Sequence, residues 1–238
     1  MKPPAAILFD LDDTILDTTD SATRVWRETA RAFEKQIGRP AEEFDPILDD
    51  SRRWYWSDPH RNQQGRLDVH RSRVEVTLHG LQQLGIDNPD LAERFTQYYS
   101  DHRVSSMRFF PGAKETLQHF HDAGLPMALI TNGDAKGQRD KVEHFGLAPL
   151  FKAVLIEGEV GYGKPDARVF TDALDACGVP PEQAWCVGDN LAWEVDGPQK
   201  LGLTGVWVDW RGQGLPVDSE ITPDRIIRAI SELQDIAP

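Results

Sequence analysis

Two carboxylates stand two residues apart directly after the first apolar run of the chain. Residues 5–9 lead into the segment DLDDT, which begins at Asp10 and places a second acid at Asp12. Acids at the ends of strands in an open α/β sheet lie at the edge where ligands bind. One such carboxylate can act as a nucleophile and the other as a general acid and base. A solvated turn whose acids cap the backbone is the alternative interpretation.

Three further segments carry side chains that suit phosphate chemistry. Thr131 and Asp189 each stand at or just after the end of an apolar run, and Lys164 precedes a proline. The proline ring holds the preceding residue extended, so the side chain of Lys164 can be aimed. Taken singly, Thr131 and Asp189 are also explained as helix caps, and Lys164 as a surface lysine.

In combination, these four segments resemble the motifs of the haloacid dehalogenase superfamily. DLDDT, Thr-Asn, Gly-Lys-Pro and Gly-Asp occur in the expected order, each on the expected kind of element. The resemblance covers residues 5–16 and 110–210, and it looks like the branch that holds nucleotidases and sugar-phosphate phosphatases. It implies a Rossmann-like core in which the first, second and fourth strands lie together at the centre of the sheet.

The resemblance implies a role for each motif residue. Asp10 would be the nucleophile that forms an aspartyl-phosphate, and Asp12 the general acid and base. Thr131 and Lys164 would hold the transferring phosphoryl group. Asp189 would bind Mg²⁺ together with Asp10 and the backbone carbonyl of Asp12. Magnesium prefers oxygen ligands, and phosphoryl transfer depends mainly on positioning and on neutralised charge.

The chain departs from the family pattern at two places. Asp13 replaces a common glycine, and since aspartate tolerates left-handed backbone we expect the turn to survive. Glu194 stands where the last motif commonly has a second aspartate. We expect it to have an indirect or water-mediated metal role, with Asp196 as the alternative.

Other reactions and functions remain open at this point. Asp12 favours phosphate esters over carbon–halogen bonds, because a leaving alkoxide needs a proton and a halide does not. The sequence therefore predicts a hydrolase for small phosphate monoesters. A phosphomutase or phosphotransferase is the first alternative and a haloacid dehalogenase a weaker one. A receiver-type signalling module is about half this length, and a binder without catalysis would not need the complete motif set.

Substrate contacts are predicted from one motif residue and from a basic stretch. Asn132 follows Thr131, while Arg52 and Arg53 open a stretch rich in arginine, histidine and aromatic residues that runs to Arg73. Such a cluster suits a second anionic group, or a ring stacked on an aromatic side chain. A solvated helix face with aromatic side chains that pack the cap is the more ordinary explanation.

The elements that must position these residues alternate along the chain. Short apolar runs at 5–9, 125–130, 153–156, 184–187 and 205–208 suit strands buried on both faces. Helical periodicity between the last four implies a parallel sheet with right-handed crossovers. We therefore expect a five-stranded α/β core, closed by a C-terminal amphipathic helix over 223–233.

About 115 residues separate the first two runs, far more than one crossover needs. Apolar positions predict helices over 20–37, capped by Asp20 or Ser21, over 67–84 and over 90–99. The expected organisation is a catalytic core of residues 1–16 and 109–238 with an all-helical cap of residues 17–108.

Composition limits the partners and the compartment. The chain has 238 residues, enough for a core and a smaller second domain, and its net charge of −13 argues against nucleic acid and anionic membranes as partners. The N-terminal apolar run is too short for a signal peptide, and no run approaches a membrane span, so we expect a cytoplasmic protein. Cys177 and Cys186 read as core thiols. The expected ligand is a small phosphorylated metabolite such as a nucleotide or sugar phosphate, and the oligomeric state is not readable.

Overall fold

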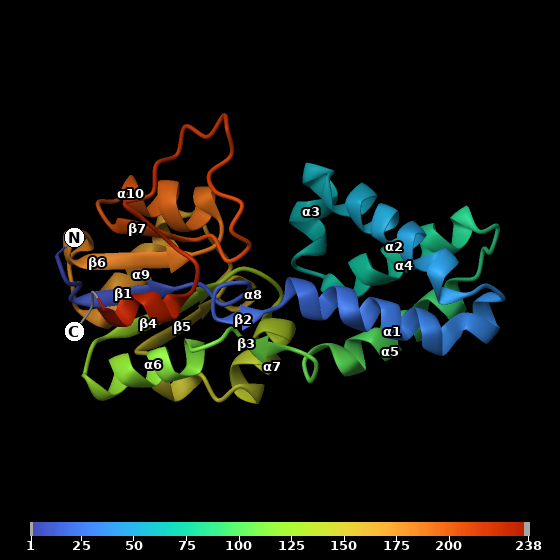
Figure 1. The fold of residues 1–238 in the computed structure, drawn as a ribbon, viewed down its shortest axis with the longest axis horizontal. Helices are drawn as coiled ribbons and strands as arrows, with labels where there is room; N and C mark the ends of the chain where they lie inside the picture. Colours follow the sequence, from blue (N-terminus) through green and yellow to red (C-terminus); the bar gives the residue numbers. More distant parts are fainter. Residues whose placement is uncertain (1, 236–238) are drawn as a thin grey trace. The chain divides into compact units, whose positions relative to one another are not determined.

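The computed structural model describes residues 2–235, and its chain forms two compact units (Figure 1). The α/β unit contains the chain up to Thr18 and from Arg108 onward, and the helical unit contains Thr19–Met107. Met1 and residues 236–238, which the sequence analysis counts in the core, lie outside the described residues.

A parallel sheet forms the centre of the α/β unit. Its six strands in the described chain are β1 (Ala6–Phe9), β4 (Met127–Thr131), β5 (Ala153–Ile156), β6 (Ala184–Gly188), β7 (Thr204–Val208) and β8 (Arg225–Ile227). Their order is β5-β4-β1-β6-β7-β8, and each neighbouring pair is parallel. The expected α/β class and the central position of the first, second and fourth apolar runs are confirmed.

The expected strand count and C-terminal helix are wrong. Residues 225–227 form β8, which pairs with β7 from Val206 to Val208, and a short 3₁₀ segment follows at Ile230–Asp235. The apolar spacing of this segment fits a helix. However, the free edge of β7 offers backbone hydrogen bonds, and a three-residue strand satisfies them.

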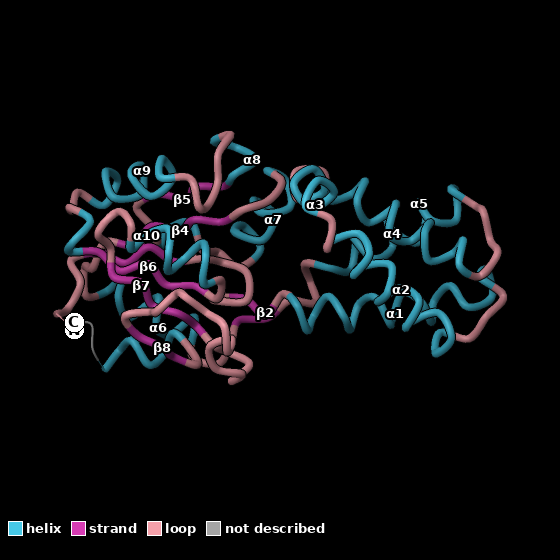
Figure 2. The backbone as a smooth tube through the Cα atoms, turned by 90° about the horizontal axis from the view of Figure 1, so that it is seen from above, coloured by secondary structure: helices cyan, strands magenta, loops and turns pink. Residues whose placement is uncertain are grey.

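Alternate side chains of β1 serve the two faces of the sheet. Ile7 and Phe9 belong to a cluster that includes Leu117 of helix α6, whereas Leu8 belongs to one that includes Phe170 of helix α9. Helices α6 and α9 lie on opposite sides of the sheet (Figure 2). The strand is therefore fully buried, which explains its uninterrupted apolar sequence.

Short helices connect these strands. They are α6 (Ala113–Asp122), α7 (Ala135–His144), α8 (Glu157–Val160), α9 (Ala167–Cys177) and α10 (Gly197–Gln199), with a π-helical segment at Leu191–Asp196 and 3₁₀ turns at Ala148–Leu150 and Pro181–Gln183. A small antiparallel pair joins β2 (Leu16–Asp17) to β3 (Arg108–Phe109). Cys186 is buried and Cys177 partly buried, and both are free thiols.

The helical unit is built from α1 (Thr19–Ile37), α2 (Ala41–Trp56), α3 (Pro59–Gly65), α4 (Val69–Gln83) and α5 (Pro89–Arg103). Side chains of Asp58, Asp68 and Asn88 cap α3, α4 and α5 by accepting backbone N–H groups. The expected helices over 20–37, 67–84 and 90–99 are found with shifted ends. Helix α1 begins at Thr19, so Asp20 and Ser21 lie in its first turn. No helix in the described chain is long and apolar enough to cross a membrane.

Candidate active site

Three predicted site residues lie at the carboxyl ends of three neighbouring strands, at one edge of the sheet. Asp10 follows β1, Thr131 ends β4 and Asp189 follows β6, and β1 lies between the other two strands. The backbone N–H of Asp10 continues the ladder by donating to the carbonyl of Val187 at 2.9 Å. Parallel strands all end at this edge, so the topology brings together residues far apart in sequence.

A buried triad of charges lies at this edge. Lys164 Nζ is 2.5 Å from Asp10 Oδ1 and 2.7 Å from Glu194 Oε1. All three residues are at most 7% exposed. Burial works against the Lys164 ammonium, but Asp10 and Glu194 outweigh it and raise its pKa. Lys164 is therefore a fixed cation between two carboxylates.

The second carboxylate oxygen of Asp10 is buried and makes no hydrogen bond of ordinary geometry among the described residues, although the Thr14 hydroxyl is near enough to act against the rise in its pKa. Burial is the main cause that raises the pKa of Asp10, against the opposing influence of Lys164. A buried carboxylate oxygen of this kind is costly unless a ligand or cation meets it. This oxygen is thus the atom available for bond formation or for a metal.

Asp189 and Glu194 complete the acidic side of the site. Burial raises the pKa of Asp189 from 3.8 to about 8, with further contributions from Asp10 and Glu194, and burial raises that of Glu194 to about 7. Trp207 Nε1 donates to the backbone carbonyl of Asp189 at 2.7 Å, which fixes the loop. Asp196 instead pairs with Lys200 on the surface, so Glu194 is the acid of this motif that reaches the site.

These residues fit a hard divalent cation. Carboxylates that raise one another's pKa repel in the absence of a cation, and a bound cation reverses that effect. No group of three or more His, Cys, Asp or Glu side chains able to hold a metal occurs within residues 2–235. A site of two carboxylates and one carbonyl, completed by water and substrate oxygens, is the arrangement that Mg²⁺ commonly uses.

The side-chain amide of Asn132 hydrogen-bonds the backbone of the loop that carries Lys164. Its Oδ1 accepts from the backbone N–H of Lys164 at 2.8 Å, and its Nδ2 donates to the Lys164 carbonyl at 2.7 Å. Both ends of the amide are therefore engaged with protein backbone. These two bonds connect Asn132 to the loop of Lys164, and the expected substrate contact of Asn132 stays a prediction.

The turn after Asp12 has the backbone that the sequence analysis expected. Asp13 has a φ of +60°, in the left-handed region, and its Oδ1 accepts from the N–H of Thr18 at 2.9 Å. A side chain that bonds its own turn in this way explains why aspartate replaces glycine here.

Two residues of helix α7, absent from the sequence prediction, contact Asp12. Lys141 Nζ lies 2.7 Å from each carboxylate oxygen, and Gln138 Nε2 donates to Oδ2 at 2.9 Å. The sequence signal for them is weak, because a glutamine and a lysine three positions apart on a polar helix are common.

The two expected arginines of the helical unit differ. The side chain of Arg53 is 72% exposed and pairs with Asp50 on its own helix. Arg52 lines a cavity of about 160 Å³ inside the helical unit. The cavity lining includes three arginines, three aromatic residues and no acid: Ala22, Trp26, Arg52, Trp56, Val69, Ser72, Arg73, Val76, Tyr99 and Arg103. Arg52 also pairs with an acid of its own helix, Asp49, at 3.1 Å, so the two arginines differ in that Arg52 lines the cavity. The anion contact of Arg52 and Arg53 stays a prediction.

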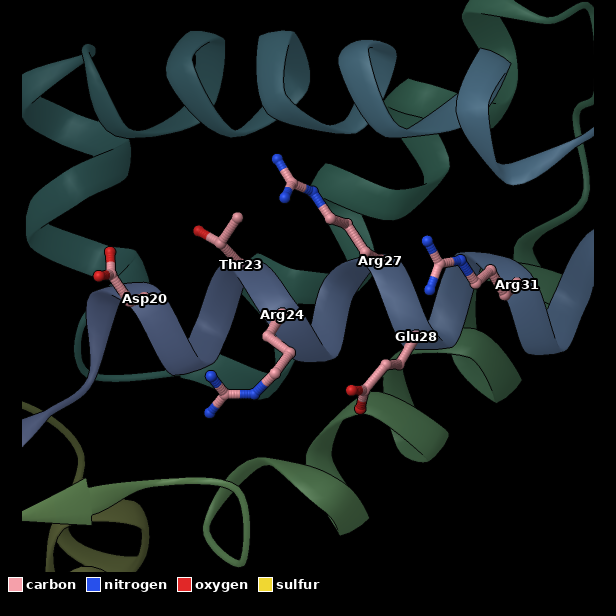
Figure 3. Close-up of a pocket in the computed structure, with 6 residues that line it drawn as sticks. All are labelled: Asp20, Thr23, Arg24, Arg27, Glu28 and Arg31. Carbon is pink, nitrogen blue, oxygen red and sulfur yellow. The ribbon is translucent and has the colours of Figure 1, made fainter.

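A larger hollow of about 560 Å³ runs along α1 (Figure 3). Its lining mixes Arg24, Arg27 and Arg31 with Asp20 and Glu28, and Figure 3 shows these side chains projecting from the same helix in different directions. Charges of both signs on one exposed helix are typical of a solvated face.

Comparison with known proteins agrees with this geometry. The model of the haloacid dehalogenase-like hydrolases matches residues 4–202. The chain belongs to this family. A solved structure of the putative HAD-hydrolase YfnB from Bacillus subtilis, bound to magnesium, has the same fold, with a TM-score of 0.76 over 99% of each chain at 22% identity.

Curated relatives of this family member are phosphatases. A phosphoserine phosphatase from Thermus thermophilus is 46% identical over 52% of this chain, and the match spans 49% of that relative's length. The N-acylneuraminate-9-phosphatase of Rattus norvegicus is 28% identical over 96% of this chain and 91% of its own. These relatives confirm the prediction of a phosphatase of this superfamily.

Proposed function

We propose that the protein is a magnesium-dependent phosphatase that hydrolyses a small phosphate monoester through an aspartyl-phosphate on Asp10. The observation that carries the proposal is the buried Asp10 carboxylate, which has one oxygen held by Lys164 and the other without a hydrogen bond of ordinary geometry among the described residues. A held and buried nucleophile next to a fixed cation is arranged for attack on an anionic ester.

Two half-reactions use these residues. In the first, Asp10 Oδ2 attacks phosphorus, the bond to the leaving oxygen breaks, and Asp12 gives that oxygen a proton. In the second, water attacks the aspartyl-phosphate, Asp12 takes a proton from the water, and the bond between Asp10 and phosphorus breaks. Lys164 and Thr131 hold the phosphoryl oxygens throughout.

Magnesium would be held by Asp10, Asp189 and the backbone carbonyl of Asp12. When bound, it supplies positive charge that offsets the repulsion between an anionic ester and the acidic edge of the sheet. Glu194 contributes indirectly, since its contacts go to Lys164 and to the N–H of Asn190.

Residues 17–108 act in this proposal as the cap that selects the substrate. The arginines and aromatic side chains of the 160 Å³ cavity suit an anionic group that is not transferred. Arg52, rather than Arg53, would make that contact, although the sequence analysis named both. Asn132 supports the site through Lys164.

The chemistry and the selection are tested separately. EDTA should abolish hydrolysis of para-nitrophenyl phosphate, Mg²⁺ should restore it, and Asp10→Asn should lower kcat roughly a thousandfold. Full activity in EDTA or in the Asp10 variant would overturn the proposed chemistry. A panel of nucleotides, sugar phosphates and phospho-acids then identifies the preferred substrate.

The matched pair Arg52→Ala and Arg53→Ala tests the cap. Arg52→Ala should raise KM for the preferred substrate and leave para-nitrophenyl phosphate nearly unaffected, whereas Arg53→Ala should change neither. Equal KM values for wild type and Arg52→Ala would remove the cavity from substrate selection without touching the chemistry.

A further inference from the structure

Two side chains of helix α7 contact the carboxylate of Asp12. Lys141 Nζ contacts Oδ1 and Oδ2 at 2.7 Å each, and Gln138 Nε2 contacts Oδ2 at 2.9 Å. The same Gln138 nitrogen donates to the carbonyl of Asn132 at 2.6 Å. Gln138 therefore ties the carboxylate of the first motif to the backbone of the second.

Local structure fixes both side chains in this arrangement. Helix α7 begins after Asp134, whose side chain accepts the N–H of Gly137 at 2.7 Å. Gln138 and Lys141 lie three residues apart, on one face of the helix, and the next residue, Val142, is buried in the core. The rotation of α7 about its axis is thus set by packing.

A glycine keeps open the space that Gln138 occupies. Gly133 has a φ of +135°, and a Cβ at this position would lie 2.9 Å from Gln138 Nε2. The turn between β4 and α7 therefore accommodates the glutamine amide by having no side chain of its own. Any larger residue at Gly133 would be strained and would push the amide from Asp12.

Burial distinguishes this ion pair from the ordinary surface pairs of the protein. The side chain of Lys141 is 14% exposed, and Gln138 is 5% exposed. Lys136, on the same helix, pairs with Asp140 while 85% exposed. The side chain of Asp12 itself is 30% exposed, so the pair is partly buried. An exposed pair holds its partner loosely, whereas contacts to both carboxylate oxygens in a partly buried pair restrict the orientation of the carboxylate.

We propose that Lys141 and Gln138 are positioning residues for Asp12. They fix the plane of the carboxylate that exchanges a proton with the leaving oxygen and then with water, and neither exchanges the proton itself. Lys141 also offsets the negative charge of Asp12 beside an anionic ester. This inference rests on the proposed function, because it takes Asp12 as the proton carrier.

A double-mutant cycle tests whether Lys141 acts through Asp12. Lys141→Met is made in the wild-type chain and in Asp12→Asn, and kcat is measured with para-nitrophenyl phosphate, whose good leaving group keeps both backgrounds measurable. We expect a loss of about tenfold or more in the first background and less than about twofold in the second, with little change in KM, since contacting residues couple this strongly. Equal losses in both backgrounds, or no loss in the wild type, would overturn the proposal.

Further variants separate positioning from folding. Lys136→Met removes the exposed lysine of the same helix and should leave kcat unchanged. Lys141→Arg keeps a bidentate cation and should recover part of the activity. If Lys141→Met does not fold, Gln138→Met replaces it in the double-mutant cycle with Asp12→Asn. The loss of kcat must then again be smaller in the Asp12→Asn background than in the wild type. If Asp10→Asn is inactive but the Lys141–Asp12 cycle is additive, this inference alone is refuted. If Asp10→Asn keeps full activity, the proposed function is refuted.

Discussion

Glu194 lies directly against the bare α-carbon of Gly188. A Cβ on Gly188 would lie 2.2 Å from Glu194 Cγ and 2.8 Å from its Cδ. Gly188 ends β6, and Glu194 reaches back across it to contact Lys164 at 2.7 Å. The absence of a side chain at one residue is therefore what allows a buried carboxylate to contact the lysine of the site.

Gly188→Ala should consequently displace Glu194 from Lys164. We expect a loss of about 1–3 kcal/mol in the free energy of unfolding, as in other overpacked cores, together with a lower kcat on every ester. Urea unfolding and steady-state kinetics measure the two effects. Gly178→Ala is the matched control, because a Cβ at Gly178 meets no atom within 4 Å, although its φ of +70° adds its own strain. Unchanged kcat in Gly188→Ala would contradict the role of the Gly188–Glu194 contact.

Lys164→Met should destabilise the protein as well as inactivate it. The substitution leaves Asp10 and Glu194 buried beside each other without the cation between them, a loss that costs about 3–5 kcal/mol in other proteins. Turnover should fall on alkyl and aryl esters alike, because the lysine acts on the phosphoryl group that all esters share. The exposed Lys136→Met, measured by the same urea unfolding, should stay within about 0.5 kcal/mol of wild type. A Lys164→Met protein as stable as wild type would contradict the buried triad.

The raised pKa values of the buried acids at the edge of the sheet predict how the free energy of unfolding depends on pH in the absence of metal. The pKa of Asp189 is raised from 3.8 to about 8 and that of Glu194 from 4.5 to about 7, so the folded protein binds more protons than the unfolded chain between these values. The free energy of unfolding in EDTA should therefore fall as pH rises from about 4 to 8. Mg²⁺ should stabilise the protein most at the upper end of this range, because it replaces the protons.

Thermal unfolding across this pH range, with EDTA or with Mg²⁺, measures both effects. Asp189→Asn should flatten the pH dependence and reduce the stabilisation by Mg²⁺. If Mg²⁺ raised the melting temperature of Asp189→Asn as much as that of wild type, Asp189 would not be a ligand.

Asp12→Asn should show a loss that depends on the leaving group. An alkyl phosphate releases a basic alkoxide that needs a proton, whereas an acyl or nitrophenyl phosphate releases a weak base. We expect a much larger fall in kcat/KM for the alkyl ester, measured over a series of esters with graded leaving groups. A uniform loss across the series would contradict the role of Asp12 as general acid.

The sequence predicts well those site residues that stand where strands end. Asp10, Thr131 and Asp189 each stand at or directly after the end of an apolar run, and the parallel topology brings them together. The local pattern thus predicts which side chains gather at this edge of the sheet, while their catalytic roles stay predictions. The left-handed turn at Asp13 was predicted on a different ground, since the resembling family commonly has glycine there and aspartate tolerates that backbone.

Pairings between distant segments could not be predicted in this way. Gln138 and Lys141 meet Asp12 across 126 and 129 residues, and nothing in the polar sequence of α7 marks them. Asn132 stands beside a motif threonine, yet its amide oxygen and amide nitrogen each bond the backbone of Lys164, 32 residues away. Edge strand β8 is only three residues long, too short for a strand period to show, so the sequence pattern of this segment favours a helix.

The pair of β2 and β3 holds the two ends of the helical unit next to each other. Asp17 pairs with Arg108, so the chain leaves and re-enters the α/β unit at adjacent points. An insertion with adjacent ends can be lengthened, shortened or exchanged for another without breaking the strand order of the sheet. Evolution can therefore replace residues 19–107 as one unit while the positions of Asp10 and Lys164 in the α/β unit are inherited unchanged.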